Sequence, residues 1–436
     1  MRGQNENVHR RANRRKNGER CLPLGRLDRE RWLWRCSASL GIACIVSMLN
    51  AGCQPGEPRS DQTATVTSKV PVGTQSFDVF AGDDIQAALD HAAEAGPGSV
   101  VRVHEGTYAP QQAGQSFLRF NAQHDGLTLE AVGAVVLTAA NAEVADPNAE
   151  SHPAIVNHVV YFGDGISRRT TIRGFTITGA NSFITQAEAS TPLEPAGGDP
   201  RLKPGLFFYA DGGAIKVFGR SVPTIQNNRI VDNSTRLCGG GISVEHRGLQ
   251  QGHVMIQDCV FFNNCCPGTG AAIDVLERSN ATIENCLFVD NIANTGMDRI
   301  ADEFGLRYND KHGCGALTVF PGSHVEVRRC TFTRNWNAVD DRGKGNLYEN
   351  CIFWHNTASD GSRPGGPYEI DILDASGVSG CLLGSETPDL RGSLDASRNT
   401  LDAPDPDFDT NFLPRSAAYA DVGYRSVIDS HISDTP

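Results

Sequence analysis

The sequence lacks several patterns that would point directly to a function. No two of its 13 cysteines stand in CxxC spacing, so they do not indicate a zinc site. No nucleophile elbow and no Ser–His–Asp or Cys–His spacing indicates a hydrolase of those kinds. The repeated segments described below show no 3.6-residue apolar period over ten or more residues, which excludes helical repeats. The chain is instead rich in glycine, with 46 residues among 436.

The N-terminal segment is basic and then apolar. Up to Ala51 it carries 11 Arg/Lys and 4 Asp/Glu, and the apolar run CSASLGIACIVSMLNAGC ends at Cys53. An apolar stretch of about 15 residues after a basic region predicts an export signal, because it is too short to span a membrane comfortably. LNAGC resembles the lipobox of bacterial lipoproteins, so we expect residues 1–53 to be a signal segment in which Cys53 is lipidated. An uncleaved membrane anchor is the alternative.

The remaining chain is acidic. Removal of the basic segment takes the net charge from −12 to about −19, and such a surface repels nucleic acid and anionic membranes. No basic stripe with interleaved aromatic residues remains, so we predict no nucleic-acid partner. A polyanionic substrate would need a local basic patch or a bridging cation. Residues 54–76, rich in Pro, Ser and Thr, are predicted to be a linker.

Five copies of one short phrase follow in the middle of the chain. The copies close on Asn233, Asn264, Asn291, Asn335 and Asn356. The residues five positions earlier are Asn228, Cys259, Cys286, Cys330 and Cys351. Apolar residues stand three and eight positions before each closing Asn, and Cys stands five positions before four of them, which predicts two short strands joined at a bend.

A glycine-rich phrase follows each copy, and also follows a degenerate earlier copy that ends at Ala180, after a gap of variable length. These phrases are GGAIKV from Gly212, GGGISV from Gly239, GAAIDV from Gly270 and CGALTV from Cys314, with weaker versions NAVDD and YEIDIL. Each unit therefore supplies about three short strands, which predicts an all-β parallel solenoid with coils about 4.8 Å apart. Equivalent residues of successive coils then form columns along the molecule.

The two repeated columns are predicted to be architectural. We place the closing Asn residues at a bend, where Asn tolerates left-handed backbone and stacked amides hydrogen-bond from coil to coil. We place the Cys column, extended by Cys381, in the interior, because unoxidised Cys behaves as a small buried apolar residue. Four further cysteines precede the glycine phrases, and whether export leads them to form disulfides is left open: Cys238, Cys265, Cys266 and Cys314.

The phrase SVPTIQNNRIVDNSTRLCGGGIS resembles the repeats of right-handed parallel β-helix proteins of the pectin-lyase-like superfamily. The stretch GDDIQAALDHAAEAGPGSVVRVHEGTYAP resembles the N-terminal cap helix and first strand of that superfamily, and DPDFDTNFLPRSAAYADVG resembles its closing coil. The resemblance implies a right-handed parallel β-helix of about 10–12 coils over residues 77–425, followed by a tail at 426–436. We expect a monomer in the bacterial periplasm or at the cell surface, anchored to the membrane by lipid.

One outward column suggests a site. In the strand that follows each glycine phrase, the outward residues are predicted to be Lys216, Ser243, Asp274, Thr318, Asp340 and Asp371. Carboxylates on one line repel one another unless a cation or a proton is shared between them. We therefore predict a site of Asp340 and Asp371 with Asp274 as third partner, in a groove walled by loops 181–211 and 292–313. The alternative is a simply solvated face.

The predicted chemistry is that of a carbohydrate-active protein. The superfamily includes polysaccharide lyases and glycoside hydrolases, so the resemblance implies a polysaccharide partner. Asp274, Asp340 and Asp371 are predicted to carry catalysis or to bind Ca²⁺, with Arg342 or Lys311 as the proton-abstracting or charge-stabilising group. The order of DD, RGK and HG differs from that of polygalacturonases, which argues against a close relationship with them. The GGAI and FxxN phrases also resemble those of surface adhesins, so a non-enzymatic glycan-binding or structural role is the second function class.

Overall fold

The computed structural model describes residues 75–185, 198–296, 300, 302, 313–356, 367–384 and 389–426. The predicted signal segment, Cys53 and Lys311 lie outside the described residues. Among the described residues, no helix combines the length and apolar character needed to cross a membrane.

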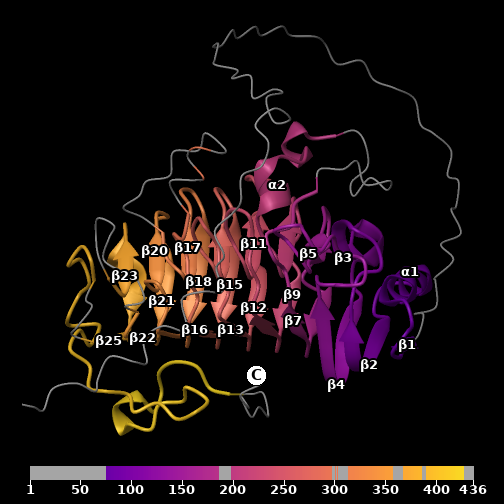
Figure 1. The fold of residues 1–436 in the computed structure, drawn as a ribbon. Coiled ribbons are helices and arrows are strands. Elements are labelled where there is room, and N and C mark those ends of the chain that lie inside the picture. Colours follow the sequence, from indigo (N-terminus) through magenta and orange to yellow (C-terminus); the bar gives the residue numbers. More distant parts are fainter. Residues whose placement is uncertain are drawn as a thin grey trace, which may run out of the picture. The chain divides into compact units, whose positions relative to one another are not determined.

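Short parallel strands stack in three rows (Figure 1). The first row pairs in the order β1 (Ser76–Val79), β2 (Val100–Tyr108), β4 (Thr128–Thr138), β6 (Thr171–Arg173), β9 (Thr224–Gln226), β12 (Val254–Gln257), β15 (Asn280–Glu284), β18 (His324–Arg328), β21 (Leu347–Glu349) and β24 (Val378–Ser379). The second row continues from the end of β4 through β7 (Thr176–Thr178), β10 (Arg229–Val231), β13 (Val260–Phe262), β16 (Leu287–Val289), β19 (Thr331–Thr333), β22 (Ile352–Trp354) and β25 (Leu382–Leu383).

The third row is a separate eight-stranded sheet. Its strands are β3 (Gly114–Phe120), β5 (Val156–Phe162), β8 (Ile215–Phe218), β11 (Ile242–Glu245), β14 (Ile273–Val275), β17 (Leu317–Val319), β20 (Val339–Asp341) and β23 (Ile370–Ile372). Each coil thus places three strands around one interior, and the predicted parallel β-helix is confirmed. Short 3₁₀ turns lie at Ala122–His124, Pro200–Leu202, Ala375–Gly377 and Ala417–Tyr419.

The first coil is closed by the predicted cap helix, α1 (Ile85–Ala95). The Asp84 side chain accepts hydrogen bonds from the backbone N–H groups of Gln86 and Ala87, which satisfies two donors that an α-helix leaves unpaired at its start. Ile85 and Leu89 are buried against the first strands, so the helix covers the apolar end of the interior.

The closing Asn residues form a buried ladder. The side-chain N–H of each donates to the side-chain oxygen of the next, at 3.1 Å for Asn233 to Asn264, 2.9 Å for Asn264 to Asn291, 2.9 Å for Asn291 to Asn335 and 2.8 Å for Asn335 to Asn356. The ladder ends on the buried carboxylate of Glu369, which accepts from Asn356. The predicted column is confirmed.

The prediction that these Asn residues have a left-handed backbone is wrong. The left-handed residues are those directly before them: Asp232, Asn263, Asp290, Arg334 and His355, with φ between 53° and 60°. The left-handed residue bends the chain, and the Asn that follows it has its side chain buried in the interior. A second left-handed residue precedes the Cys column in the same way: Asn227, Asp258, Asn285, Arg329 and Asn350.

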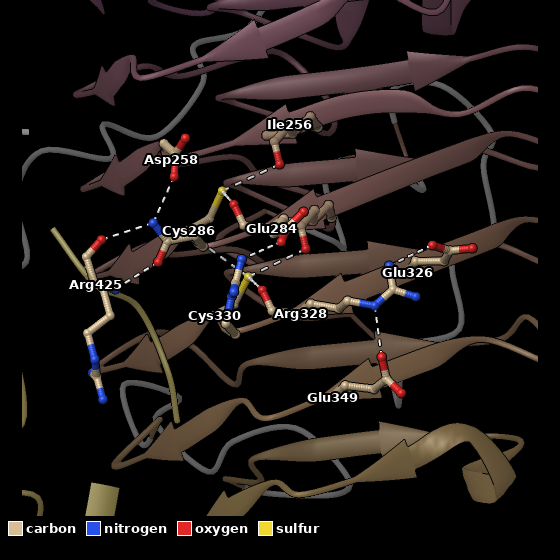
Figure 2. A network of polar contacts seen from close by, with 12 residues as sticks. Ile256, Asp258, Glu284, Cys286, Glu326, Arg328, Cys330, Glu349 and Arg425 are labelled. Carbon is tan, nitrogen blue, oxygen red and sulfur yellow. Dashed lines mark hydrogen bonds and ion pairs between the residues drawn. The ribbon is translucent and has the colours of Figure 1, made fainter. Parts of the chain in front are cut away.

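The Cys column lies inside, as predicted. Cys259, Cys286, Cys330, Cys351 and Cys381 are fully buried. Figure 2 shows Cys286 Sγ directed at the carbonyls of Ile256 (3.7 Å) and Glu284 (3.3 Å), so these thiols satisfy backbone carbonyls at the bend. Beside the column, aromatic rings stack nearly parallel, with centroids 4.5–5.0 Å apart: Phe261, Phe288, Phe332 and Phe353.

The outer face of the first strand row carries paired charges. Arg328 donates to Glu349 at 2.8 Å and to Glu326 at 2.7 Å (Figure 2), and Arg173 pairs with Glu130 further along. All are partly exposed, so each pair contributes little stability. Within these pairs the charges neutralise one another.

The C-terminal segment does not form the closing coil that its sequence suggested. It returns along the outside of the second strand row, where Tyr424 packs against Val260, Leu287 and Val289. Arg425 is tied by its backbone N–H to Asn285 Oδ1 at 2.7 Å, and its carbonyl accepts from Asn285 Nδ2 at 2.9 Å (Figure 2). The apolar outward residues of this row explain the difference, because they require a cover that a further coil would not provide.

We expect Gly423→Ala to loosen this C-terminal segment. Gly423 has a φ of 79°, and a Cβ atom there would lie 2.4 Å from Ile352 Cδ1 and 2.6 Å from Thr331 Oγ1. The strain should cost roughly 1–3 kcal/mol, localised to the segment. Limited proteolysis should cut near the C-terminus faster than in the wild type. Gly345→Ala, also left-handed but with no atom within 4 Å of the added Cβ, is the control; equal cleavage in both variants would contradict this account.

The buried His246 should make the stability of the fold sensitive to acid. Its Nδ1 accepts from the Asn280 N–H at 3.2 Å, its Nε2–H donates to the Ser221 carbonyl at 2.9 Å, and burial lowers its pKa to about 4. Because the unfolded chain takes up this proton at a pKa of about 6.5, the stabilisation is present above that pH and is lost as the pH falls towards 4. The thermal midpoint of His246→Gln should therefore fall less than that of the wild type between pH 7 and about pH 4.5.

Candidate functional site

The predicted outward column is formed in register. On the eight-stranded sheet, Lys216 pairs with Ser243, Ser243 with Asp274, Asp274 with Thr318, Thr318 with Asp340, and Asp340 with Asp371. We call these six residues the polar row. As predicted, Asp340 and Asp371 lie on adjacent coils and Asp274 lies two coils from Asp340.

The polar row is buried, which corrects the expectation of an open groove or a solvated face. Thr318 is the most exposed of the six, at 4%. At one end the inserted helix α2 (Leu206–Ala210) covers the sheet, and its Phe208 packs on Tyr161 and Phe218. The sequence could not indicate this cover, because the insertions have no repeat period. Of the two predicted wall loops, residues 186–197, 297–299, 301 and 303–312 lie outside the described residues.

At the C-terminal end of the row, Arg342 bridges two carboxyl groups. Its Nη2 lies 2.6 Å from Asp340 Oδ1 and 2.6 Å from Asp371 Oδ2. Arg391 approaches Asp371 from the other side, with Nε 2.5 Å from Oδ1. The chain thus supplies its own cation between Asp340 and Asp371, where a calcium ion was predicted. A calcium ion there would have to displace Arg342.

The two carboxyl groups differ in their surroundings. Burial, followed by the adjacent Asp371, raises the pKa of Asp340 well above its ordinary value. Asp340 Oδ1 lies 2.6 Å from Arg342 Nη2 but outside hydrogen-bond geometry, so Arg342 offsets the burial only by its charge. Burial thus favours the protonated form of Asp340 beside the ion pairs of Asp371.

At the N-terminal end of the row, Lys216 is fully engaged. Its ammonium donates to the Phe207 carbonyl at 3.0 Å and to Ser243 Oγ at 3.1 Å, and lies 2.7 Å from Glu245 Oε2. Arg247 also pairs with Glu245, at 2.5 Å. The Lys216 ammonium therefore pairs with Glu245 and hydrogen-bonds the backbone of α2.

Asp211, Cys238 and Asp274 meet next to Lys216. One carboxylate oxygen of each Asp and the Cys238 Sγ all lie within 4.8 Å of one another, and all three residues are buried. Burial raises the pKa of Asp211 to about 8, and burial followed by Asp211 raises the pKa of Asp274 well above its ordinary value. Neither oxygen of Asp274 has a hydrogen-bond partner.

Unsatisfied carboxylate oxygens concentrate along this row. Among the described residues, the buried carboxylate oxygens without a hydrogen bond are Asp211 Oδ2, Glu245 Oε2, both oxygens of Asp274 and Asp340 Oδ1. Of these, Glu245 Oε2 is ion-paired with Lys216 and Asp340 Oδ1 with Arg342. Every one belongs to the polar row or to a residue beside it. Buried polar atoms are rarely left unpaired in native proteins, and exceptions indicate a functional site or a bound ion or water.

Other charged residues close in sequence to the polar row are not part of it. Asp341 points into the coil, where Tyr348 Oη donates to it at 2.8 Å. Arg278 and Glu277 are exposed and pair with each other at 3.5 Å. Lys311 lies outside the described residues, so its predicted role stays a prediction.

The sequence pattern did not predict three residues that lie at the site: Arg391, Asp211 and Cys238. Arg391 comes from a segment without repeats, and no pattern could have found it. Asp211 and Cys238 each stand directly before a glycine phrase, and this shared offset could have placed them side by side on adjacent coils. Cys238 was considered only for disulfides. Cys238, Cys266 and Cys314 are reduced cysteines, so no disulfide joins any two of the four residues considered.

The architecture is that of a parallel β-helix in which one row of polar residues is buried. Comparison with known families agrees: the model described as "Right handed beta helix region" matches residues 157–288 and 249–378, together just over half of the chain. The chain belongs to the right-handed β-helix family.

Further comparisons add little to this assignment. No curated protein matches the chain. Among solved structures, a mutant of the PL6-family alginate lyase AlyGC is similar at 12% identity and a TM-score of 0.25, over 81% of this chain and 57% of that one. The chain thus spans little more than half the length of that lyase, and we draw nothing about function from the likeness.

Proposed function

We propose that this chain is an exported, carbohydrate-active β-helix protein that binds an acidic polysaccharide at the Arg342–Arg391 end of the polar row and cleaves it by elimination. The carrying observation is the pair of part-exposed guanidinium groups at this end, Arg342 and Arg391, set against the buried carboxyl groups of Asp340 and Asp371. A buried row of this kind is destabilising unless it serves a site. Lipidation at Cys53, in the periplasm or at the cell surface, is part of the proposal.

The charges at this end suit a uronic acid. The Arg391 side chain is 35% exposed and that of Arg342 is 16% exposed, whereas those of Asp340 and Asp371 are at most 2% exposed. A glycan would therefore meet the two guanidinium groups first. Paired with a uronate carboxylate, they would neutralise it and acidify the adjacent C–H, as elimination requires.

The acid next to the guanidinium groups supports elimination over hydrolysis. Burial raises the pKa of Asp340, which favours the protonated acid that gives its proton to the departing glycosidic oxygen. Arg342 stands between Asp340 and Asp371, in the place that a sugar or a nucleophilic water needs in a carboxylate-pair hydrolase. Lys311 remains the proposed proton-abstracting base, and Ca²⁺ a proposed aid to neutralising the uronate.

The test uses the full exported chain with polyuronates. We expect release of unsaturated uronate, seen as ultraviolet absorbance, and at least a tenfold loss of kcat/KM in Arg391→Ala. Arg415→Ala is the matched control, because Arg415 is 61% exposed and lies 3.9 Å from its partner Asp407. Equal activity in the wild type and Arg391→Ala would refute the assignment, as would the absence of both binding and product for every polyuronate.

A non-enzymatic glycan-binding role is the second candidate. The observation that favours it is the burial of the polar row, at most 4% exposed, which keeps a glycan from the carboxyl groups in this conformation. In that case calorimetry would detect polysaccharide binding that depends on Arg391, and no product would form with or without Ca²⁺.

A further inference from the structure

The N-terminal end of the polar row holds a second cluster that the proposed function does not use. Asp211 is the residue that ends α2, Cys238 occupies the equivalent place one coil later, and Asp274 lies in β14. A carboxylate oxygen of each Asp and Cys238 Sγ lie within 4.8 Å of one another. The three side chains reach one point from an inserted helix and two successive coils.

Among the residues that the structure describes, the cluster has no cation of its own. Lys216 acts electrostatically on both carboxyl groups, but its ammonium is engaged by the Phe207 carbonyl, Ser243 and Glu245. Asp274 is fully buried, and neither of its oxygens accepts a hydrogen bond. An isolated buried carboxylate is costly, and buried charges are ordinarily paired or coordinate a metal.

Hydrogen bonds from neighbouring groups orient Asp211 and Cys238. The Cys238 N–H holds Asp211 Oδ1 at 2.9 Å and leaves Oδ2 without a partner. The Thr269 hydroxyl donates to Cys238 Sγ at 3.6 Å, which favours a thiolate. Such contacts orient metal ligands from behind.

Glycine keeps the backbone close to Asp274. A Cβ atom on Gly239 would lie 3.2 Å from Asp274 Cβ, and one on Gly270 would lie 3.1 Å from it. Both glycines are left-handed, with φ of 63°. The Asp274 side chain thus sits in a cradle of two glycines, where a larger residue would shift its carboxylate.

We infer that Asp211, Cys238 and Asp274 bind one divalent transition-metal ion of the zinc type through two carboxylates and a thiolate. Thiolate and carboxylate ligands suit Zn²⁺, and the thiolate disfavours Ca²⁺ and Mg²⁺. Three protein ligands leave a fourth tetrahedral position for water. Because one ligand ends α2 and two come from the coils, the ion would fasten the inserted segment to the sheet and stabilise the folded chain.

The experiment titrates the full chain, purified under reducing conditions and treated with a chelator, with Co²⁺ and then Zn²⁺. We expect one equivalent of Co²⁺ to give thiolate-to-metal charge transfer and the intense visible bands of tetrahedral cobalt, and Zn²⁺ to abolish both. Cys238→Ser should lose the charge-transfer band, and Asp274→Asn should bind at least tenfold more weakly. The matched control is Cys314→Ser, because Cys314 bonds the Leu317 carbonyl and Thr318 instead and should leave the spectra unchanged.

A stability measurement guards against variants that misfold. Without metal, Asp274→Asn should be folded by circular dichroism and melt at or above the wild-type temperature, because it removes an unpaired carboxyl. Zn²⁺ should raise the melting temperature of the wild type and of Cys314→Ser, but not of Asp274→Asn. A wild type without cobalt bands or a zinc shift would overturn the inference and leave two carboxyl groups that share a proton. So would a charge-transfer band that survives in Cys238→Ser. Neither result depends on polysaccharide turnover.

Discussion

Replacing Arg342 with Ala should destabilise the folded chain by about 3–5 kcal/mol, because removal of one partner of a buried ion pair leaves the other charge unpaired. Arg342 Nη2 lies 2.6 Å from carboxylate oxygens of both Asp340 and Asp371, whose side chains are 2% and 1% exposed. Arg391 still reaches Asp371 but none of its contacts reaches Asp340. Equilibrium denaturation at neutral pH measures the loss.

The control variants separate charge from packing. Arg278→Ala removes an arginine that is 69% exposed and should change stability by less than about 0.5 kcal/mol. Adding Asp340→Asn and Asp371→Asn to Arg342→Met should recover much of the loss, since a neutral buried set needs no counter-ion. The deficit of Arg342→Ala should also shrink as the pH falls, because Asp340, whose pKa burial raises, takes up a proton and then carries no unpaired charge. A loss below about 1 kcal/mol would show that the bridge contributes little.

Asn291→Ala should cost about 2–4 kcal/mol, because the amide lies in the middle of the ladder and its loss strands several buried groups. Its Nδ2 donates to the carbonyls of Phe261 and Val289, both at 3.1 Å, and to Asn335 Oδ1 at 2.9 Å. Its Oδ1 accepts from the backbone N–H and Nδ2 of Asn264, at 3.1 and 2.9 Å.

The comparison for the ladder is Asn148→Ala. Asn148 is exposed, and its side chain bonds only Asp146, so its removal should fall within about 0.5 kcal/mol. Any polysaccharide or metal binding measured per folded molecule should be unchanged in Asn291→Ala, because the ladder lies between strands and away from the polar row. Equal melting temperatures for the two variants would contradict the structural role of the ladder.

The sequence by itself determined the coil. The constant five-residue spacing between the Cys and Asn columns, and the fixed place of the glycine phrase, are properties of one repeat unit. In-register parallel stacking then carries each position onto its equivalent in the next coil. This is why Asp340 could be placed beside Asp371, and why the Asn ladder and the buried Cys column could be predicted before their contacts were known.

Only the tertiary structure decided what covers the coil. The helix α2 and the C-terminal segment around Tyr424 have no repeat period, so no alignment of copies indicates that they pack on outward faces of the strands. Their packing turns a predicted exposed row into a buried one, and burial changes the chemistry: the pKa of Asp340 rises, and Arg342 takes the place predicted for calcium. Local periodicity fixes which residues are neighbours along the stack, whereas the protonation and charge pairing of those neighbours depend on desolvation by distant segments of the chain.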